Sequence, residues 1–219
     1  MYYKDANIEV NVSKHLRRLT AKIGICSGQN ILDVACGTGA WLLAASECGA
    51  KPAGIDLSAK AIDICKKNLP NGTFHTGAAE TLPFFADKQF DIVSCLGSLE
   101  HFLEPKAALE EMVRVAKDDA IFLLLVPNAD FLTRRLGFYH GTHQVDAKEE
   151  VRTLTEWNKL FEESGLQVKE RWKDLHVLSW SWITANRWYH APFRAAQAIA
   201  LMTWPLSWQY QVYHLCVRR

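Results

Sequence analysis

The sequence predicts an α/β protein with a doubly wound sheet of about seven strands, mostly parallel, with the last strand antiparallel. Two observations support this fold class. Over roughly the first two thirds of the chain, short apolar segments alternate with amphipathic ones, as in strands joined by helices. An early apolar segment also ends in a turn with two glycines that leads into a helix, a connection typical of nucleotide-binding sheets. At 219 residues the chain suits a single domain, 1–219, with a full core.

Apolar segments bounded by turn residues predict seven strands. These are Ile31–Val34, Lys51–Ile55, Thr73–Thr76, Phe90–Cys95, Ala120–Val126, Leu166–Trp172 and Tyr210–Val217. Amphipathic segments predict helices between them, over Ile8–Lys22, Thr38–Cys48, Ser58–Asn68, Pro105–Ala116 and Glu156–Ser164. Ser58 and Thr155 are the expected N-caps, and Pro105 suits a first helical position. The first helix would form an N-terminal helical cap, 1–28, and a Trp-rich helical insert, 175–208, would precede the last strand.

Composition and charge exclude several classes of protein. The formal net charge is +1 with no basic cluster, so the chain shows no electrostatic footprint for nucleic acid. The N-terminus lacks the apolar core of a signal peptide. The six cysteines have no CxxC spacing and are expected to be buried, reduced side chains. We therefore expect a cytoplasmic protein, in which a homodimer is compatible with the sequence.

The segment Asp33–Gly39 follows the first predicted strand and holds the two glycines of the turn. Glycine accepts positive φ and lets a ligand approach the backbone, and the helix that follows offers free N–H groups. Asp33 would repel a pyrophosphate, which favours a ligand with a cationic or hydroxyl-bearing end. Asp56, at the end of the second strand, is placed to accept hydrogen bonds from ribose hydroxyls. Because the third glycine of an NAD fingerprint is missing, these residues favour S-adenosylmethionine over NAD.

Over residues 28–172 the chain resembles class I S-adenosylmethionine-dependent methyltransferases, in the group that includes ubiquinone- and menaquinone-pathway enzymes. Four ordered segments carry the resemblance: Asp33–Gly39, Gly54–Ser58, Gly77–Phe84, and Phe90–Cys95 followed by Leu99–Phe102. The resemblance implies a Rossmann-like sheet, and transfer of a methyl group to oxygen, nitrogen or carbon of a small acceptor. S-adenosylhomocysteine would be the product.

The resemblance also implies which residues bind the cofactor. They are Asp33, Ala35, Gly37, Gly39, Asp56, Leu57, Ala78, Ala79, Glu80 and Leu96. Asp33 would support the methionine end. Two positions depart from the family pattern, since Ala35 replaces a glycine and Ala78 replaces an Asp that binds the adenine amino group. Backbone groups near Ala78 and Ala79, or the side chain of Glu80, would then contact the adenine.

Three histidines are candidate catalytic bases, because a hydroxyl or acidic-carbon acceptor must lose a proton during methyl transfer. They are His101, after the fourth strand, and His140 and His143, in the segment after the fifth. Tyr139, Trp180 and Trp188 are candidate substrate-binding residues. No metal site is expected, because Asp130 with Asn128 is not a carboxylate cluster.

Six of the eight tryptophans fall in the last quarter of the chain. Three interpretations stay open: core packing, a lid over a pocket for an aromatic or lipophilic acceptor, or a surface in peripheral contact with a membrane or partner. The segment Ala195–Val217 has no charged residue but contains Gln, His and Pro, which argues against a transmembrane helix. Alternatives to a small-molecule enzyme are a catalytically silent cofactor-binding scaffold, or an RNA or protein methyltransferase.

Overall fold

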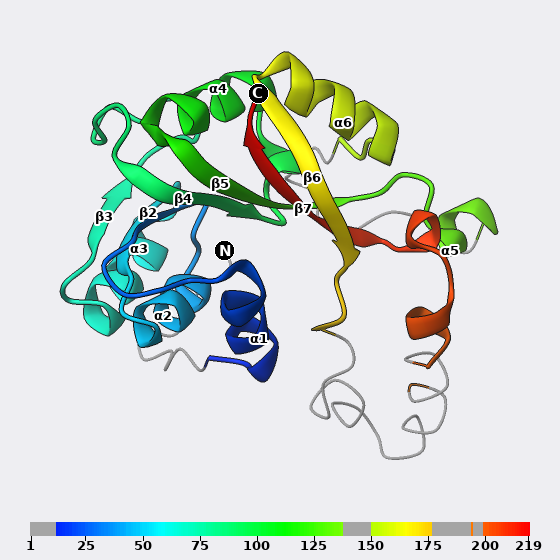
Figure 1. The fold of residues 1–219 in the computed structure, drawn as a ribbon, viewed down its shortest axis with the longest axis horizontal. Coiled ribbons are helices and arrows are strands. Elements are labelled where there is room, and N and C mark those ends of the chain that lie inside the picture. Colours follow the sequence, from blue (N-terminus) through cyan, green and yellow to red (C-terminus); the bar gives the residue numbers. More distant parts are fainter. Residues whose placement is uncertain (1–11, 138–149, 177–193, 195–198) are drawn as a thin grey trace.

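A seven-stranded sheet forms the centre of the protein in a computed structural model, which describes residues 12–137, 150–176, 194 and 199–219 (Figure 1). The strands are β1 (Asn30–Val34), β2 (Lys51–Asp56), β3 (Thr73–Thr76), β4 (Phe90–Leu96), β5 (Ala116–Pro127), β6 (Leu166–Lys173) and β7 (Gln211–Arg218). Their order across the sheet is β3-β2-β1-β4-β5-β7-β6. The pairs among β1 to β5 are parallel, whereas β7 lies antiparallel between β5 and β6. The predicted fold class is therefore confirmed.

Helices cover both faces of this sheet. They are α1 (Lys14–Ile23), α2 (Ala40–Glu47), α3 (Ala59–Asn68), α4 (Pro105–Val115), α5 (Leu132–Arg135) and α6 (Leu154–Glu163), with 3-10 turns η1 (Leu99–His101) and η4 (Leu206–Trp208). In Figure 1, α1, α2 and α3 lie on one side of the sheet and α4 and α6 on the other. Each side buries an apolar core. Leu42 and Ile62 pack in the first core, and Leu109 and Trp157 pack in the second.

The N-cap of α6 is Thr153, so the expected cap at Thr155 is wrong. The Thr153 hydroxyl accepts a hydrogen bond from the Glu156 backbone N–H at 3.2 Å, and the Glu156 carboxylate accepts one from the Thr153 N–H at 2.7 Å. This is a capping box, which satisfies two N–H groups at the helix start. Thr155 lies two residues too late for that exchange.

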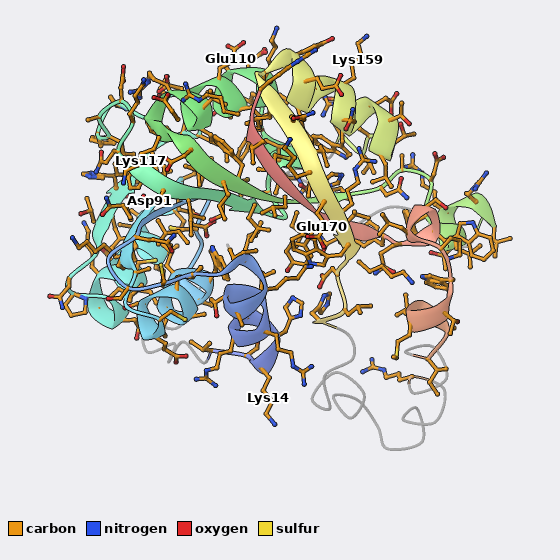
Figure 2. All side chains as sticks on the ribbon, viewed as in Figure 1. Lys14, Asp91, Glu110, Lys117, Lys159 and Glu170 are labelled. Carbon is orange, nitrogen blue, oxygen red and sulfur yellow. The ribbon has the colours of Figure 1, made fainter. Side chains whose placement is uncertain are left out.

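Strand β5 begins at Ala116, earlier than the expected start at Ala120, and directly after α4. Ala116 pairs with Phe90, the first residue of β4. Beside that pair, Lys117 and Asp91 form an ion pair at 2.6 Å, and both are labelled in Figure 2. The charged start of β5 is therefore held to β4 at the amino-terminal edge of the sheet. The opposite, carboxyl-terminal edge carries the candidate site.

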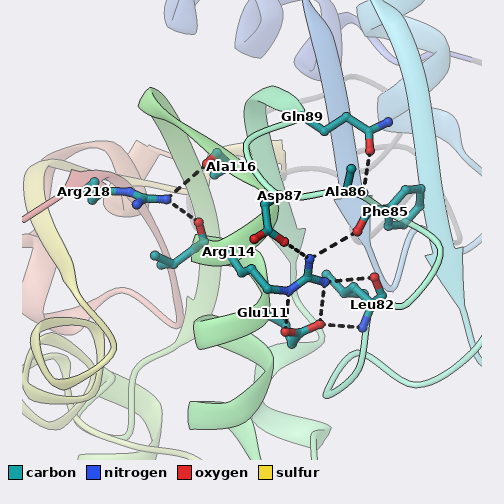
Figure 3. A network of polar contacts seen from close by, with 10 residues as sticks. Leu82, Phe85, Ala86, Asp87, Gln89, Glu111, Arg114, Ala116 and Arg218 are labelled. Atoms are coloured by element: carbon teal, nitrogen blue, oxygen red, sulfur yellow. Dashed lines mark hydrogen bonds and ion pairs between the residues drawn. The ribbon is translucent and has the colours of Figure 1, made fainter.

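The loop after β3 is fixed to α4 by the guanidinium of Arg114 (Figure 3). Arg114 forms two hydrogen bonds with Glu111, at 2.7 and 2.8 Å, and one with Asp87 at 2.6 Å. It also donates to the backbone carbonyls of Leu82 at 3.0 Å and Phe85 at 3.2 Å. One side chain therefore holds the segment that leads out of the predicted adenine region.

Two expectations of the sequence fall partly outside the described residues. The predicted helix start at Ile8 is one. The other is the helical insert, of which the described part includes a helical turn at 199–203 and then η4. Within the described ranges, no helix combines the length and the apolar character needed to cross a bilayer.

All six cysteines are free thiols. Four are buried as expected: Cys36, Cys65, Cys95 and Cys216. Cys26 is exposed, contrary to expectation, because it lies in the turn between α1 and β1 instead of within an element.

Candidate cofactor and acceptor site

The turn between β1 and α2 passes through three residues with left-handed backbone: Ala35 (φ 61°), Gly37 (φ 53°) and Gly39 (φ 78°). A Cβ built on Gly39 would lie only 2.9 Å from Sγ of Cys65 on α3, so a side chain there requires a shift of its neighbours. Gly39 is also the N-cap of α2. The turn therefore lies at the carboxyl-terminal edge of the sheet, directly in front of the N-terminus of α2.

Asp56 ends β2 and its carboxylate reaches the same turn. Oδ2 accepts a hydrogen bond from the Gly37 N–H, and Oδ1 accepts one from the Ser58 N–H, both at 2.8 Å. A carboxylate offers about four lone-pair positions, so each oxygen keeps capacity for one more donor. Two neighbouring hydroxyls of a ribose would match that capacity.

Asp33 lies beneath the turn with only 3% of its surface exposed. Its Oδ1 accepts a 2.6 Å hydrogen bond from Ser94 Oγ, which in turn accepts a 3.0 Å bond from Trp41 Nε1. Burial raises the pKa of Asp33 to about 7, with a smaller contribution of the same sign from the nearby charge of Asp56. A cationic ligand would favour the ionised carboxylate, whereas a phosphate would be repelled.

Four further predicted cofactor residues lie at or just after the carboxyl ends of neighbouring strands. Leu57, directly after Asp56, has a side chain that is 78% exposed at the sheet edge. Leu96, at the end of β4, is partly buried, and Ala79 is buried. Ala78 precedes it, after a backbone bond of 3.0 Å from the Gly77 N–H to the Asp56 carbonyl. This bond places the predicted adenine segment next to the end of β2.

The carboxylate of Glu80 binds backbone N–H groups just before the start of α4. Its Oε1 accepts hydrogen bonds from the backbone N–H groups of Leu103 at 3.1 Å and Glu104 at 3.4 Å. One carboxylate oxygen is thus already used before any ligand binds. An adenine contact by Glu80 stays a prediction, and it would fall to Oε2.

The predicted catalytic and substrate-binding residues are placed only in part. His101 is exposed in η1. Tyr139, His140, His143, Trp180 and Trp188 lie outside the described residues.

An apolar cavity of about 280 Å³ lies beside the start of β7. Its lining comes from α5, the end of β6 and the segment that leads through η4 into β7: Phe131, Thr133, Asp174, His176, Leu201, Trp204, Trp208, Gln209, Tyr210 and Gln211. Nε2 of Gln211 lies 3.6 Å from the position of a Cβ built on Gly97, the residue after β4. Strand β4 lies parallel to β1, with Ser94 paired to Asp33, so Gly97 and the glycine turn follow strand ends at the same edge of the sheet. The cavity therefore adjoins that edge.

Asp174 and His176 form the polar end of this cavity, and sequence reasoning missed both. Asp174 is buried, and its Oδ2 lies 2.5 Å from Nδ1 of His176. Its Oδ1 accepts the His176 backbone N–H at 3.0 Å. His15 on α1 approaches the same Oδ1 at 3.4 Å and bonds the Tyr213 hydroxyl at 3.0 Å. An Asp-x-His spacing just after a predicted strand was the available signal.

Comparisons with known proteins agree with this geometry. The sequence profile of a family described as "Methyltransferase domain" matches residues 7–171. The uncharacterized methyltransferase YcgJ of Bacillus subtilis is 29% identical over 178 residues, which cover 75% of this chain and 68% of YcgJ. Its crystal structure superposes with a TM-score of 0.59 at 24% identity, covering 93% of this chain and 95% of that one.

Two further relatives carry names that state an activity. The ubiquinone biosynthesis O-methyltransferase of Pseudomonas entomophila is 28% identical over 162 residues, 66% of this chain and 67% of that protein. The demethylmenaquinone methyltransferase of Renibacterium salmoninarum is 36% identical over 111 residues, only about half of either protein, at 50% and 46%. With the glycine turn and the carboxylates Asp33 and Asp56 at the sheet edge, these matches show that the chain belongs to the methyltransferase-domain family, as a class I S-adenosylmethionine-dependent methyltransferase.

Proposed function

We propose that this protein transfers the methyl group of S-adenosylmethionine to a small aromatic or lipophilic acceptor. The supporting observation is the cavity walled by Phe131, Leu201, Trp204 and Trp208, whose lining residue Gln211 lies close to Gly97 at the end of β4. At about 280 Å³ it suits a compact ligand instead of a polymer. Its position beside the end of β4 would bring an acceptor to the edge where the cofactor binds.

The names of the relatives favour the same class of acceptor. Two of them act in ubiquinone biosynthesis or on demethylmenaquinone by name, and one is named an O-methyltransferase. A net charge of +1 gives no support for a nucleic acid acceptor.

The chain's own residues bind and align the reactants. S-adenosylmethionine supplies, when bound, a methyl group on a positively charged sulfur. Asp56 would hold the ribose hydroxyls through its two remaining acceptor positions, and Asp33 would face the cationic end of the cofactor. Catalysis then depends mainly on holding the acceptor in line with the methyl group. Such alignment by itself strongly accelerates methyl transfer.

Binding of the cofactor is tested by calorimetry with S-adenosylmethionine. Asp56→Ala should weaken the affinity at least about tenfold, because a hydrogen bond to a charged group contributes about 1.5–3 kcal/mol. Unchanged affinity would reject the ribose assignment.

The acceptor class is tested with methyl-labelled S-adenosylmethionine and a small-molecule cell extract. Label should enter the organic-extractable fraction. Leu201→Trp fills the cavity and should reduce this labelling at least about tenfold while cofactor affinity is kept. Leu136→Trp, at an exposed position outside the cavity lining, is the matched control. Label in protein or nucleic acid would reject the small-molecule acceptor, and no label in any fraction would favour the scaffold alternative.

A further inference from the structure

We propose that His176 is the general base of the reaction, with Asp174 as the residue that positions the base, and that the acceptor loses a proton on methylation, as a hydroxyl compound does. This inference rests on the proposed function and extends it to the chemistry of the acceptor. It depends on one juxtaposition, a histidine–aspartate pair that lines the apolar cavity beside the cofactor edge.

Asp174 is fixed from several sides by the start of β7. Its backbone N–H donates to the Gln211 carbonyl at 3.1 Å, and its own carbonyl accepts from Gln209 Nε2 at 2.9 Å. Gln209 in turn accepts from Trp204 Nε1 at 3.2 Å. The carboxylate is only 4% exposed, so it cannot easily turn away from His176. The pair is therefore held in place by the same residues that wall the cavity.

The hydrogen bond defines which ring nitrogen can act. Nδ1 of His176 is engaged with Asp174 at 2.5 Å, so Nε2 is the ring nitrogen that a ligand in the cavity can reach. A carboxylate in this position fixes the tautomer with a proton on Nδ1 and stabilises the imidazolium that forms when Nε2 takes a second proton. The remaining cavity lining is mostly aromatic or amide, which leaves His176 as the proton acceptor nearest a bound ligand.

The surroundings of the two histidines favour protonation of His176 over protonation of His15. The hydrogen bond that Nδ1 of His176 donates to the Asp174 carboxylate raises the pKa of His176, whereas burial lowers the pKa of His15. Burial also raises the pKa of Tyr213, so its phenol stays protonated. Arg18, from α1, acts on His15 and further disfavours its charged form. Of the two histidines that approach Asp174, His176 is the one that gains a proton.

The chemical step balances without any further reactant. The acceptor oxygen forms a bond to the methyl carbon while the carbon–sulfur bond breaks and its electron pair stays on sulfur. The acceptor's hydroxyl proton passes to Nε2 of His176 and is later released to water. The products are a methyl ether, S-adenosylhomocysteine and one proton. An acceptor without a proton to lose would gain nothing from this pair.

Two probes of similar shape separate the hypotheses: 2-naphthol, which must lose a proton, and isoquinoline, whose nitrogen is methylated without losing one. With 2-naphthol, His176→Gln should lower kcat by about a hundredfold or more at little change in KM, the usual contribution of a general base. Any isoquinoline methylation should be unaffected. His75→Gln, on the opposite edge strand β3, is the matched control. Asp174→Asn should shift the acidic limb of the kcat–pH profile to lower pH, because Asp174 raises the pKa of His176.

The outcomes distinguish this inference from the proposed function. Wild-type activity on 2-naphthol that survives in His176→Gln, or wild-type activity on isoquinoline alone, would overturn the inference and leave the function standing. If neither probe is methylated, the test is NMR of the imidazole signals with S-adenosylhomocysteine and 2-naphthol both added. Absence of a shift in the His176 signals would then overturn the inference, and a shift would support it. A failure of the extract-labelling experiment would instead count against the function itself.

Discussion

Replacing Asp33 by asparagine should stabilise the ligand-free protein at alkaline pH and change little at acidic pH. Asp33 is buried, and its pKa is raised to about 7 from the ordinary 3.8. Between these two values the folded state keeps a proton that the unfolded state has already lost. Stability from this group is therefore complete below about pH 4 and falls as the pH rises toward and through 7. Asparagine is neutral throughout, and its side-chain oxygen can still accept from Ser94.

The magnitude follows from the two pKa values. A difference of about three pH units at about 1.36 kcal/mol each gives a total effect of about 4 kcal/mol. About half of this, roughly 2 kcal/mol, falls between about pH 5.5 and pH 8. The difference in unfolding free energy, Asp33→Asn minus wild type, should therefore increase by roughly 2 kcal/mol across that range.

The assay is urea unfolding of both proteins, without ligand, at several pH values. Other titrating groups cancel in the difference, and Asp63→Asn on the exposed side of α3 serves as control. A difference that stays within about 0.5 kcal/mol from pH 5.5 to pH 8 would refute the reasoning. The same substitution should weaken S-adenosylmethionine binding, so the stabilised variant would be the less active one, as expected where a binding site stores unfavourable charge.

Three further substitutions test the turns and caps. Gly39→Ala should destabilise the folded protein by at least about 1–2 kcal/mol in urea unfolding, because φ is 78° and the new Cβ meets Cys65. Adding Cys65→Ala should recover part of this lost stability. Unchanged stability of Gly39→Ala would contradict the observed packing. Ala35→Gly should gain up to about 1 kcal/mol by relieving a left-handed alanine, and a loss would contradict the strain. Thr153→Ala should lower the melting temperature and cost about 1 kcal/mol, whereas Thr155→Ala should change stability little; equal effects would reject the capping box.

Most of the fold could be predicted because burial imposes periodicity on the sequence. Strands such as β4 and β2 are bounded by turn residues, and their observed bounds differ from the expected ones by one residue. The start of β5 was missed because Lys117, Asp118 and Asp119 look like a charged turn. In the fold these residues extend the strand past the core, where an ion pair to Asp91 replaces apolar burial.

The cap at Thr153 could have been read from the sequence, since Thr153 and Glu156 have the spacing of a capping box. The position of β7 within the sheet could not have been predicted from the sequence. Nothing local in Gln211–Arg218 states that this strand enters between β5 and β6, because that choice depends on pairing between segments far apart in the chain.

The same distinction between local spacing and long-range packing applies to the residues of the candidate site. The glycine turn and Asp56 lie close together in sequence at a spacing typical of nucleoside-binding sheets, so their proximity could be predicted, and the structure brings them into contact. His176 was missed because its proposed role depends on Gln209 and Gln211, more than thirty residues later, which fix Asp174 in place. The Asp-x-His spacing is visible in the sequence, but the packing that buries Asp174 and builds the cavity joins segments that are far apart in the chain.

The position of β7 also decides when this protein can complete its fold. The second half of β5 is strongly apolar, with Phe122, Leu123, Leu124 and Val126 all fully buried, and β7 supplies its second hydrogen-bonding partner. As the chain leaves the ribosome, β5 therefore waits with an open apolar edge until more than eighty further residues have been made. Such an edge invites pairing with other chains. Nascent chains should consequently depend on chaperones until β7 has emerged, and the cavity that Gln209, Tyr210 and Gln211 help to line is completed only with that segment.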